Sequence, residues 1–577
     1  MAFNTLRFLP LAAALTIAVV APLHAQLAWN LAEESILPVA DIKQGMTGEV
    51  RTVFMGTRIE SFAVRVTGIL SNGLGPGKDL IICELTDPRV QASGAVAGMS
   101  GSPLYINGRL AGALSYQLQR FETVRFAGFT PIRDMLEVGM IPPSLEPMPL
   151  QRSGATGKEK DDIVALQPVF ALSGISPKVA DLFKPQLEAI GLNVVSLGGN
   201  SGSTAPTEAI TSFEPGGAVA VALATGDISV AATGTVSMVD GNRLLAFGHP
   251  LLSLGDVDLP MATSEIVTIL PSALSSFKVS NTGPVVGTIN QDRLSAVYGE
   301  VGRSPLMIPV HVEVATPAGK RTLNFEVIRH ELLAPQIAAM GVAQAVMGWN
   351  AAGVANGYEL DVEITFNGRE PLRRRAIFAG PGGFASGIAA FTQELTAWIS
   401  NPITRIFPDK ISFKVDAMTR NPALIVDQFI IERQEVTGGD TLRVAVAVRG
   451  FQQESEKAVV EIPIDPSWAG RNLEVVLADG PTLDEWTGRP RTLSLAGMRD
   501  FERLVSYVRS LRPTDGVFLA VVESGAIIAD QQDNARDYPG SVERIVRGAD
   551  ASRFEKRDAV FPLWEKQLFP GTVTTHS

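Results

Sequence analysis

Short β-type runs, separated by turns that contain glycine, recur along this chain and limit the folds open to it. One block extends over residues 38–145 and contains RTVF at 51–54 and AVRV at 63–66. A second block extends over 213–330 and contains GTV at 234–236. Runs of this kind, bounded by glycine, are typical of strands joined by tight turns. The sequence therefore predicts a fold that is mainly β with some α-helix.

The length of 577 residues implies more than one hydrophobic core. Between and after the two β blocks, apolar spacing predicts helices near 177–190, 332–349, 386–400 and 496–511. The predicted organisation is a signal peptide (1–25), a β unit (38–145), a linker and helix (146–212), a second β unit (213–330), a helical and β connector (331–404), a β-sandwich-like module (405–485) and a helical tail (486–577).

The N-terminus has the pattern of a secretory signal peptide. Arg7 precedes an apolar run over residues 8–23, and Ala25 supplies a small residue for cleavage. The run is short for a membrane span and contains Pro10 and Pro22. We therefore expect an exported protein, in the periplasm or outside the cell, with no transmembrane segment in the mature chain.

Charge and the metal-binding residue types exclude several classes of function. The net charge of −11 disfavours a nucleic-acid partner, because phosphate binding requires a basic surface. The single cysteine, Cys83, can form neither an internal disulfide nor a multi-cysteine metal site. Away from the ends the chain has only His249, His311 and His330, in no metal-ligand spacing. We expect no metal and no organic cofactor.

The hexapeptide GMSGSP at 98–103 suggests nucleophilic chemistry at Ser100. A serine hydroxyl needs a base to remove its proton and donors to hold an oxyanion. Gly98 and Gly101 permit a tight turn around Ser100, so that the backbone N–H groups of Gly98 and Ser100 could form an oxyanion hole. The alternative is an ordinary glycine- and serine-containing hairpin loop.

His249 is the best candidate for the base, because it lies in a Gly-His-Pro turn at a strand end, where side chains reach clefts. The third member of a triad would be a carboxylate that orients the imidazole. Asp87, 13 residues before Ser100, is the first candidate for this role. The rival carboxylates are Asp256, Asp258 and Asp292.

These motifs together resemble the stage IV sporulation protein B (SpoIVB) peptidase family, serine peptidases of the chymotrypsin-like group. The matching segments are TDPR at 86–89, GMSGSP at 98–103, and GTV at 234–236 followed by FGHP at 247–250. Lesser matches are GTIN at 287–290, PGG at 215–217 and NGRLAGA at 107–113. The resemblance implies Ser100 as nucleophile, His249 as base and Asp87 as the orienting carboxylate.

The chain departs from the family pattern in two ways. The family order is His, Asp, Ser, whereas here Asp87 and Ser100 precede His249. PGG at 215–217 also runs almost directly into GTV, which leaves no room for the family's PDZ domain. A triad is defined by geometry and not by chain order. We therefore predict two adjacent β-barrel-like units that share one cleft.

The resulting hypothesis is an exported serine endopeptidase that cleaves a protein or peptide substrate. In it, the Ser100 hydroxyl should lie close to one ring nitrogen of His249, and Asp87 should face the other. Residues 405–577 would bind a partner, the cell envelope or the enzyme's own cleft. The rival hypothesis is a non-catalytic envelope-binding or scaffold protein that retains the peptidase fold.

Overall fold

The computed structural model describes most of the chain. The described residues are 29–118, 124–142, 163–196, 212–270, 276–317, 319–348, 356–400, 406–450, 452–487, 489, 500–523, 527–529, 535–536, 553–555, 558–569 and 572–576. The predicted signal peptide lies outside them, and so do residues 151–162 of the predicted linker and helix region.

Six N-terminal strands close into a ring, called the first ring below. Its strands are β1 (Thr47–Val53), β2 (Ile59–Gly75), β3 (Lys78–Leu85), β4 (Pro103–Ile106), β5 (Arg109–Leu118) and β6 (Phe126–Pro131). Their sheet order is β4-β1-β2-β3-β6-β5, and an additional pairing of β4 with β5 joins the two ends. Inward-facing residues such as Val64, Ile81 and Phe129 form its core, because alternate residues of a strand face the same side.

Six later strands form the second ring. They are β10 (Ala218–Gly226), β11 (Ser229–Asp240), β12 (Arg243–Ala246), β13 (Gly255–Leu270), β14 (Phe277–Arg293) and β15 (Ala296–Val301). Their order is β10-β13-β14-β15-β12-β11, and β10 also pairs with β11. When each ring is numbered from its own first strand, both have the cyclic order 1-2-3-6-5-4. The two β blocks of the sequence are therefore topological copies of one another.

The second ring belongs to a larger 13-stranded sheet. Strands β16 (Met307–Thr316), β17 (Gly319–Ile328), β18 (Gly357–Thr365), β19 (Leu372–Ala379) and β20 (Lys410–Met418) extend it beyond β10, and β8 (Val169–Ser173) and β9 (Asn193–Ser196) extend it beyond β11. Helices α3 (Pro177–Ala189), α4 (Leu333–Met347) and α5 (Gly380–Ile399) share one apolar core with it. Helix α4 is buried on all sides, which explains its uniformly apolar sequence.

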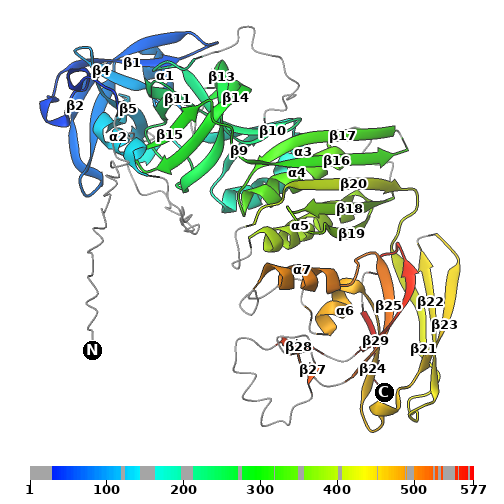
Figure 1. Ribbon diagram of the computed structural model, residues 1–577. Helices are drawn as coiled ribbons and strands as arrows, with labels where there is room; N and C mark the ends of the chain where they lie inside the picture. Colours follow the sequence, from blue (N-terminus) through cyan, green and yellow to red (C-terminus); the bar gives the residue numbers. More distant parts are fainter. Residues whose placement is uncertain are drawn as a thin grey trace, which may run out of the picture.

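A C-terminal module follows at the other end of the molecule (Figure 1). A three-stranded sheet of β21 (Leu424–Ile431), β22 (Thr441–Gly450) and β23 (Ser455–Pro463) shares an apolar core with a four-stranded sheet of β24 (Leu473–Asp479), β25 (Gly516–Glu523), β29 (Asp558–Glu565) and β30 (Thr572–His576). Helix α6 (Gly480–Trp486) packs on the outer face of the second sheet. Helix α7 (Phe501–Ser510) instead joins the core of the large sheet.

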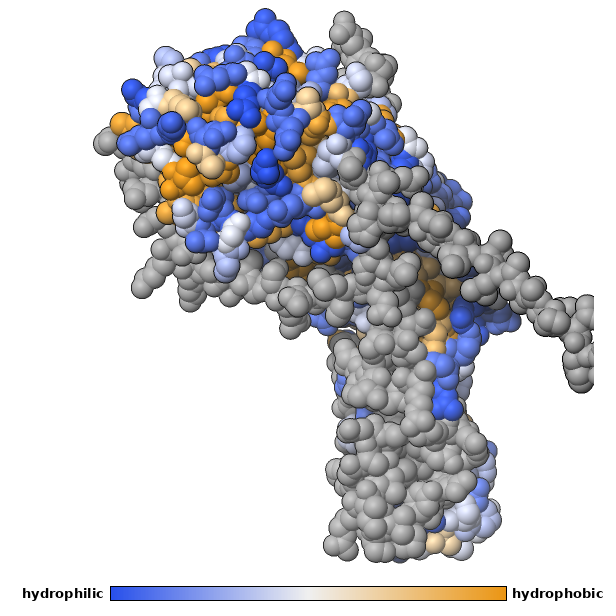
Figure 2. Space-filling model, turned by 60° about the vertical axis from the view of Figure 1, so that its left-hand side comes forward, coloured by the Kyte–Doolittle hydropathy of each residue, from blue (hydrophilic) through white to orange (hydrophobic). Residues whose placement is uncertain are grey.

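Shorter elements complete the described chain. They are the 3-10 turns η2 (Glu33–Ser35), η3 (Val39–Asp41) and η4 (Pro466–Trp468), helices α1 (Pro88–Ser93) and α2 (Ile132–Met140), and strands β7 (Ile163–Ala165), β26 (Ile527–Ala529), β27 (Ala535–Arg536) and β28 (Arg553–Glu555). Figure 2 shows the ring region, where hydrophobic residues lie in small groups among hydrophilic ones. No helix among these residues is long and apolar enough to cross a membrane.

The prediction of a mainly β fold with multiple sheets is confirmed. Helices α3 and α4 lie where the sequence predicted them, and α5 begins six residues earlier than the predicted 386. Two details need correction. Strand β20, assigned to the sandwich-like module, belongs to the large sheet. The tail predicted to be helical contains α7, but its other described elements after residue 500 are strands.

Candidate active site

The Ser100 loop connects the third and fourth strands of the first ring. Gly98 and Gly101 have φ angles of 95° and 94°, in the region that disfavours residues with a side chain. A Cβ atom at Gly101 would also overlap the backbone of Thr235 and Phe247 in the second ring. The two glycines of GMSGSP are therefore required by the turn and by its close contact with the other ring.

The loop leaves two backbone donors free beside Ser100. The N–H of Met99 donates to Val96 O (2.9 Å), that of Gly101 to Leu114 O (2.7 Å) and that of Ser102 to Met99 O (3.0 Å). Within the described residues, no acceptor is paired with the N–H of Gly98 or of Ser100. This is the arrangement that an oxyanion hole needs, since its donors must be available to the substrate.

The His249 loop occupies the same place in the second ring, between that ring's third and fourth strands, β12 and β13. Asp292, at the end of β14, accepts hydrogen bonds from the N–H groups of Leu251 (2.6 Å), Leu252 (2.8 Å) and Leu254 (3.1 Å). This buried carboxylate therefore fixes the turn that immediately follows His249. Burial raises the pKa of Asp292, while the backbone donors oppose that change.

Hydrogen bonds from β11 of the second ring hold the Ser100 loop. The N–H of Thr235 donates to Ser100 O (2.8 Å), and its hydroxyl donates to Gly98 O (2.9 Å). The hydroxyl of Ser237 donates to Gly101 O (2.7 Å). In the other direction, Thr130 of the first ring donates its hydroxyl to Gly248 O (2.6 Å). The structure thus brings the Ser100 and His249 loops together at the junction of the rings.

The side chains of Ser100 and His249 are buried, and one polar atom of each is unpaired within the described residues. Ser100 is 1% exposed and His249 is fully buried. Within the described residues, Ser100 Oγ and His249 Nε2 have no hydrogen-bond partner, so the predicted Ser100–His249 hydrogen bond is not formed. Buried polar atoms without partners are rare and often mark a functional site. His249 Nδ1 lies 2.7 Å from the carbonyl oxygen of Pro250.

Burial lowers the pKa of His249 to about 4, although the backbone carbonyls of Pro250 and Leu166 favour the charged ring. The imidazole is therefore neutral at physiological pH, which is the state that a general base requires.

Asp87 has local partners. Its carboxylate caps α1 by accepting from the N–H of Arg89 (2.9 Å), and it also pairs with the Arg89 guanidinium (3.0 Å). The side chain of Arg89 lowers the pKa of Asp87. His249 Nδ1 has Pro250 O as its neighbour, and so Asp87 is not its hydrogen-bond partner in this structure.

The other predicted carboxylates and histidines also have partners of their own. Asp256 pairs with Arg293 (2.8 Å), and Asp258 accepts from the N–H of Leu306 (2.7 Å). The His311 ring contacts the Asn324 side chain, and His330 Nδ1 accepts from backbone N–H groups at the start of α4. No cluster of potential metal ligands occurs among the described residues.

Lys278, at the start of β14, is a buried amine that the sequence did not predict. It is 6% exposed, and its Nζ donates to Thr52 Oγ1 (2.9 Å). Burial lowers its pKa to about 7. Its methylene groups pack on Gly98, and its N–H donates to Ala97 O (2.9 Å). Nothing in the sequence around Lys278 distinguishes it from a surface lysine.

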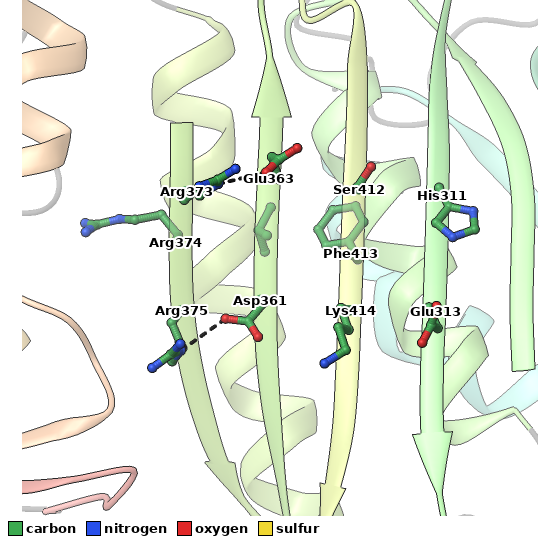
Figure 3. A pocket seen from close by; sticks show the side chains of 11 residues that line it. His311, Glu313, Asp361, Glu363, Arg373, Arg374, Arg375, Ser412, Phe413 and Lys414 are labelled. Atoms are coloured by element: carbon green, nitrogen blue, oxygen red, sulfur yellow. Dashed lines mark hydrogen bonds and ion pairs between the residues drawn. The ribbon is translucent and has the colours of Figure 1, made fainter. Parts of the chain in front are cut away.

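A separate hollow of about 540 Å³ lies on the face of β16, β18, β19 and β20 (Figure 3). Its charged side chains pair between neighbouring strands, Arg373 with Glu363 (2.8 Å) and Arg375 with Asp361 (3.1 Å). Such pairing is typical of a solvated sheet face. The hollow contains none of the predicted catalytic residues.

Residues 20–126 match a protein-family model described as SpoIVB peptidase S55. This finding puts the chain in the class of serine peptidases. Within that class, the matched segment is similar to the SpoIVB peptidase family, the family that GMSGSP and TDPR predicted. The match includes Asp87 and Ser100 but not His249, so the exchanged block order remains a prediction. Neither the curated proteins nor the solved structures gave a match.

Proposed function

We propose that this chain is an exported serine endopeptidase in which Ser100 attacks a peptide carbonyl and His249 accepts the serine proton. The observation that carries the proposal is that the Ser100 loop and the His249 loop, which occupy equivalent places in the two rings, lie together at the junction. Thr235 of one ring holds the Ser100 loop of the other, and the unpaired Ser100 Oγ and His249 Nε2 are both buried at this junction.

The reaction follows from the groups present. Transfer of the Ser100 proton to Nε2 of the neutral His249 leaves an alkoxide that adds to the substrate carbonyl carbon. The N–H groups of Gly98 and Ser100 then donate to the resulting oxyanion. Protonated His249 returns the proton to the leaving amine, and water releases the acyl group by the same steps in reverse.

The carboxylate that orients His249 differs from the sequence prediction, which was Asp87. Asp87 is engaged by Arg89, whereas Asp292 holds three backbone N–H groups of the loop that carries His249. We therefore assign Asp292 as the positioning carboxylate, acting through the loop, and Asp87 as the cap of α1. A partner or the cell envelope could bind the C-terminal module.

Covalent labelling with a fluorophosphonate tests the nucleophile, because these reagents phosphonylate activated serines. After long incubation the native protein should gain one adduct, and Ser100→Ala should gain none. Ser102→Ala is a matched control in the same loop, since the Ser102 hydroxyl donates to Met99 O (2.6 Å). An adduct that persists in Ser100→Ala, or no adduct on the native protein, would support the scaffold alternative instead.

A further inference from the structure

Residues 163–173, called the strap below, cross the junction between the two rings. Its first part is β7, which pairs antiparallel with β5 through Ala165 and Tyr116. Its last part is β8, which pairs antiparallel with β11 through Phe170 and Ala232. One continuous segment therefore adds a strand to each ring and spans the space between them.

The strap and the Ser100 loop lie next to each other along the same edge of β5. Leu114 exchanges hydrogen bonds with that loop, because its O accepts from Gly101 and its N–H donates to Ser102 O (2.9 Å). The next residue of β5, Ser115, accepts at its O from the N–H of Leu166 in the strap (2.9 Å). The strap and the nucleophile loop are thus neighbours on one strand edge.

The strap also lies beside the two candidate catalytic loops. Ser115, whose O accepts from the N–H of Leu166, packs against Gly248, the residue before His249. Val169 and Ala171 line a small enclosed cavity together with Gly98 and Lys278. The side chain of Leu166 is 4% exposed and packs in the core of the first ring. The strap therefore lies over the two candidate catalytic loops. Leu166 anchors its first part, whereas Phe170 and Leu172, both fully buried in the core of the large sheet, hold its second part in place.

We propose that the first part of the strap, residues 163–168, occupies within its own chain the groove that receives an extended peptide substrate. Proteins often bind extended peptides by strand addition, with backbone hydrogen bonds for affinity and side-chain pockets for specificity. The first part of the strap uses the edge of β5 in this way, and Leu166 takes the place of a substrate side chain in the apolar core of the first ring. While the strap is bound, the groove is closed to substrates. A substrate that binds there carries an apolar residue that replaces Leu166. This inference rests on the proposed peptidase function.

The rate of fluorophosphonate labelling tests the strap in the full-length chain. Leu166→Gly removes the buried anchor without adding a charge, so it should label at least about tenfold faster than the native protein. Val164→Ala is the matched control: Val164 is 37% exposed on the same strand, and its label rate should be unchanged. Hydrogen exchange at residues 163–168 reports release of the first part of the strap, and exchange in β8 and β11 reports that the rings stay folded.

A second variant covers the case in which Leu166→Gly does not release the strap. Leu166→Pro deletes the N–H that donates to Ser115 O and keeps an apolar ring. A synthetic peptide with the sequence of the first part of the strap, IVALQP, should slow the labelling of either released variant to near the native rate. A peptide with the same composition in scrambled order should have no effect.

The outcomes separate the two proposals. Faster labelling with a released strap, reversed by the peptide, supports the strap inference. Equal labelling of native and released proteins at Ser100 would overturn the strap inference and leave the peptidase function standing, as would failure of the peptide to slow the reaction. Absence of any Ser100 adduct in proteins whose strap is released would overturn the peptidase function, and the strap inference with it.

Discussion

At the residue scale, burial in the fold keeps the His249 ring neutral. A histidine in water has a pKa of about 6.5, but burial holds the folded value near 4. Between these two values the unfolded chain binds a proton that the folded chain does not. The titration of His249 should therefore leave the free energy of unfolding unchanged above pH 6.5. That free energy should fall by about 3 kcal/mol as the pH falls toward 4.

His249→Gln should remove that part of the pH dependence, because glutamine does not titrate. Urea unfolding at pH 4.5 and pH 7 measures the difference for each protein. His311→Gln is the control, since the His311 ring only contacts Asn324 in an exposed pair. Equal pH dependence in the native protein and in His249→Gln would show that His249 is not the buried neutral group described above.

Lys278 gives the opposite kind of prediction, because its burial costs stability at neutral pH. Its folded pKa of about 7 lies below the ordinary 10.5, so the unfolded chain binds the extra proton between these values and stability should rise with pH across that window. Lys278→Met should therefore stabilise the protein by about 2 kcal/mol or more at pH 7, even with the Thr52 hydrogen bond lost.

Thermal unfolding at pH 7 and pH 10 measures the effect of Lys278→Met. The increase in the unfolding temperature should be smaller at pH 10 than at pH 7. Lys320→Met is the control and should leave the unfolding temperature unchanged at both pH values, because the side chain of Lys320 is 74% exposed. A destabilised Lys278→Met protein would mean that the amine makes a stabilising interaction that its Thr52 contact does not explain.

At the scale of elements, Asp87 and Asp292 hold different parts of the two rings in place. Asp87 caps a six-residue helix, and Asp292 anchors the His249 loop. Asp292→Asn replaces one of the two carboxylate oxygens with an NH2 group, so at least one of the three loop N–H groups loses its acceptor and the fluorophosphonate labelling rate should fall about tenfold or more. Asp87→Asn should leave the rate nearly unchanged, since asparagine is also a good cap. The reverse result would restore Asp87 as the triad carboxylate.

The sequence predicted those elements whose signals are local. Gly98 and Gly101 indicated the tight turn at Ser100, and apolar spacing indicated α3 and α4. The closure of each ring was not predictable in detail, because it depends on pairings such as β10 with β11 that only the folded chain sets. Lys278 was missed for the same reason, since its burial comes from distant strands.

The C-terminal tail was misread for a different reason. In β25, Val517, Leu519 and Val521 face one apolar core, while Phe518, Ala520 and Val522 face another. A strand buried on both faces loses the alternation that identifies half-buried strands. The amphipathic spacing of α7 nearby was correct, but it does not extend into the rest of the tail.

At the scale of the whole molecule, α7 links the C-terminal module to the large sheet. Phe501, Leu504 and Val508 join the core of that sheet, and Phe501 packs edge-on against Phe366. Leu504→Asp would bury an unpaired charge, which should separate the module from the sheet. Small-angle scattering should then report a larger radius of gyration.

The rings carry the proposed chemistry without α7, so the Ser100 labelling rate of Leu504→Asp should stay within about twofold of the native rate. Glu502→Asp, on the exposed face of the same helix, is the control and should leave both measurements unchanged. Loss of labelling together with expansion would show that the module supports the site.

The central claim is that Ser100 at the ring junction cleaves peptide bonds. Turnover of fluorescein-labelled casein by Leu166→Gly, compared with the double variant Leu166→Gly/Ser100→Ala, tests it most directly, because both proteins carry the same change in the strap. We predict release of labelled peptides by the first protein and a loss of at least about 1,000-fold in the second. Equal turnover by the two proteins, or none by either, would contradict the claim.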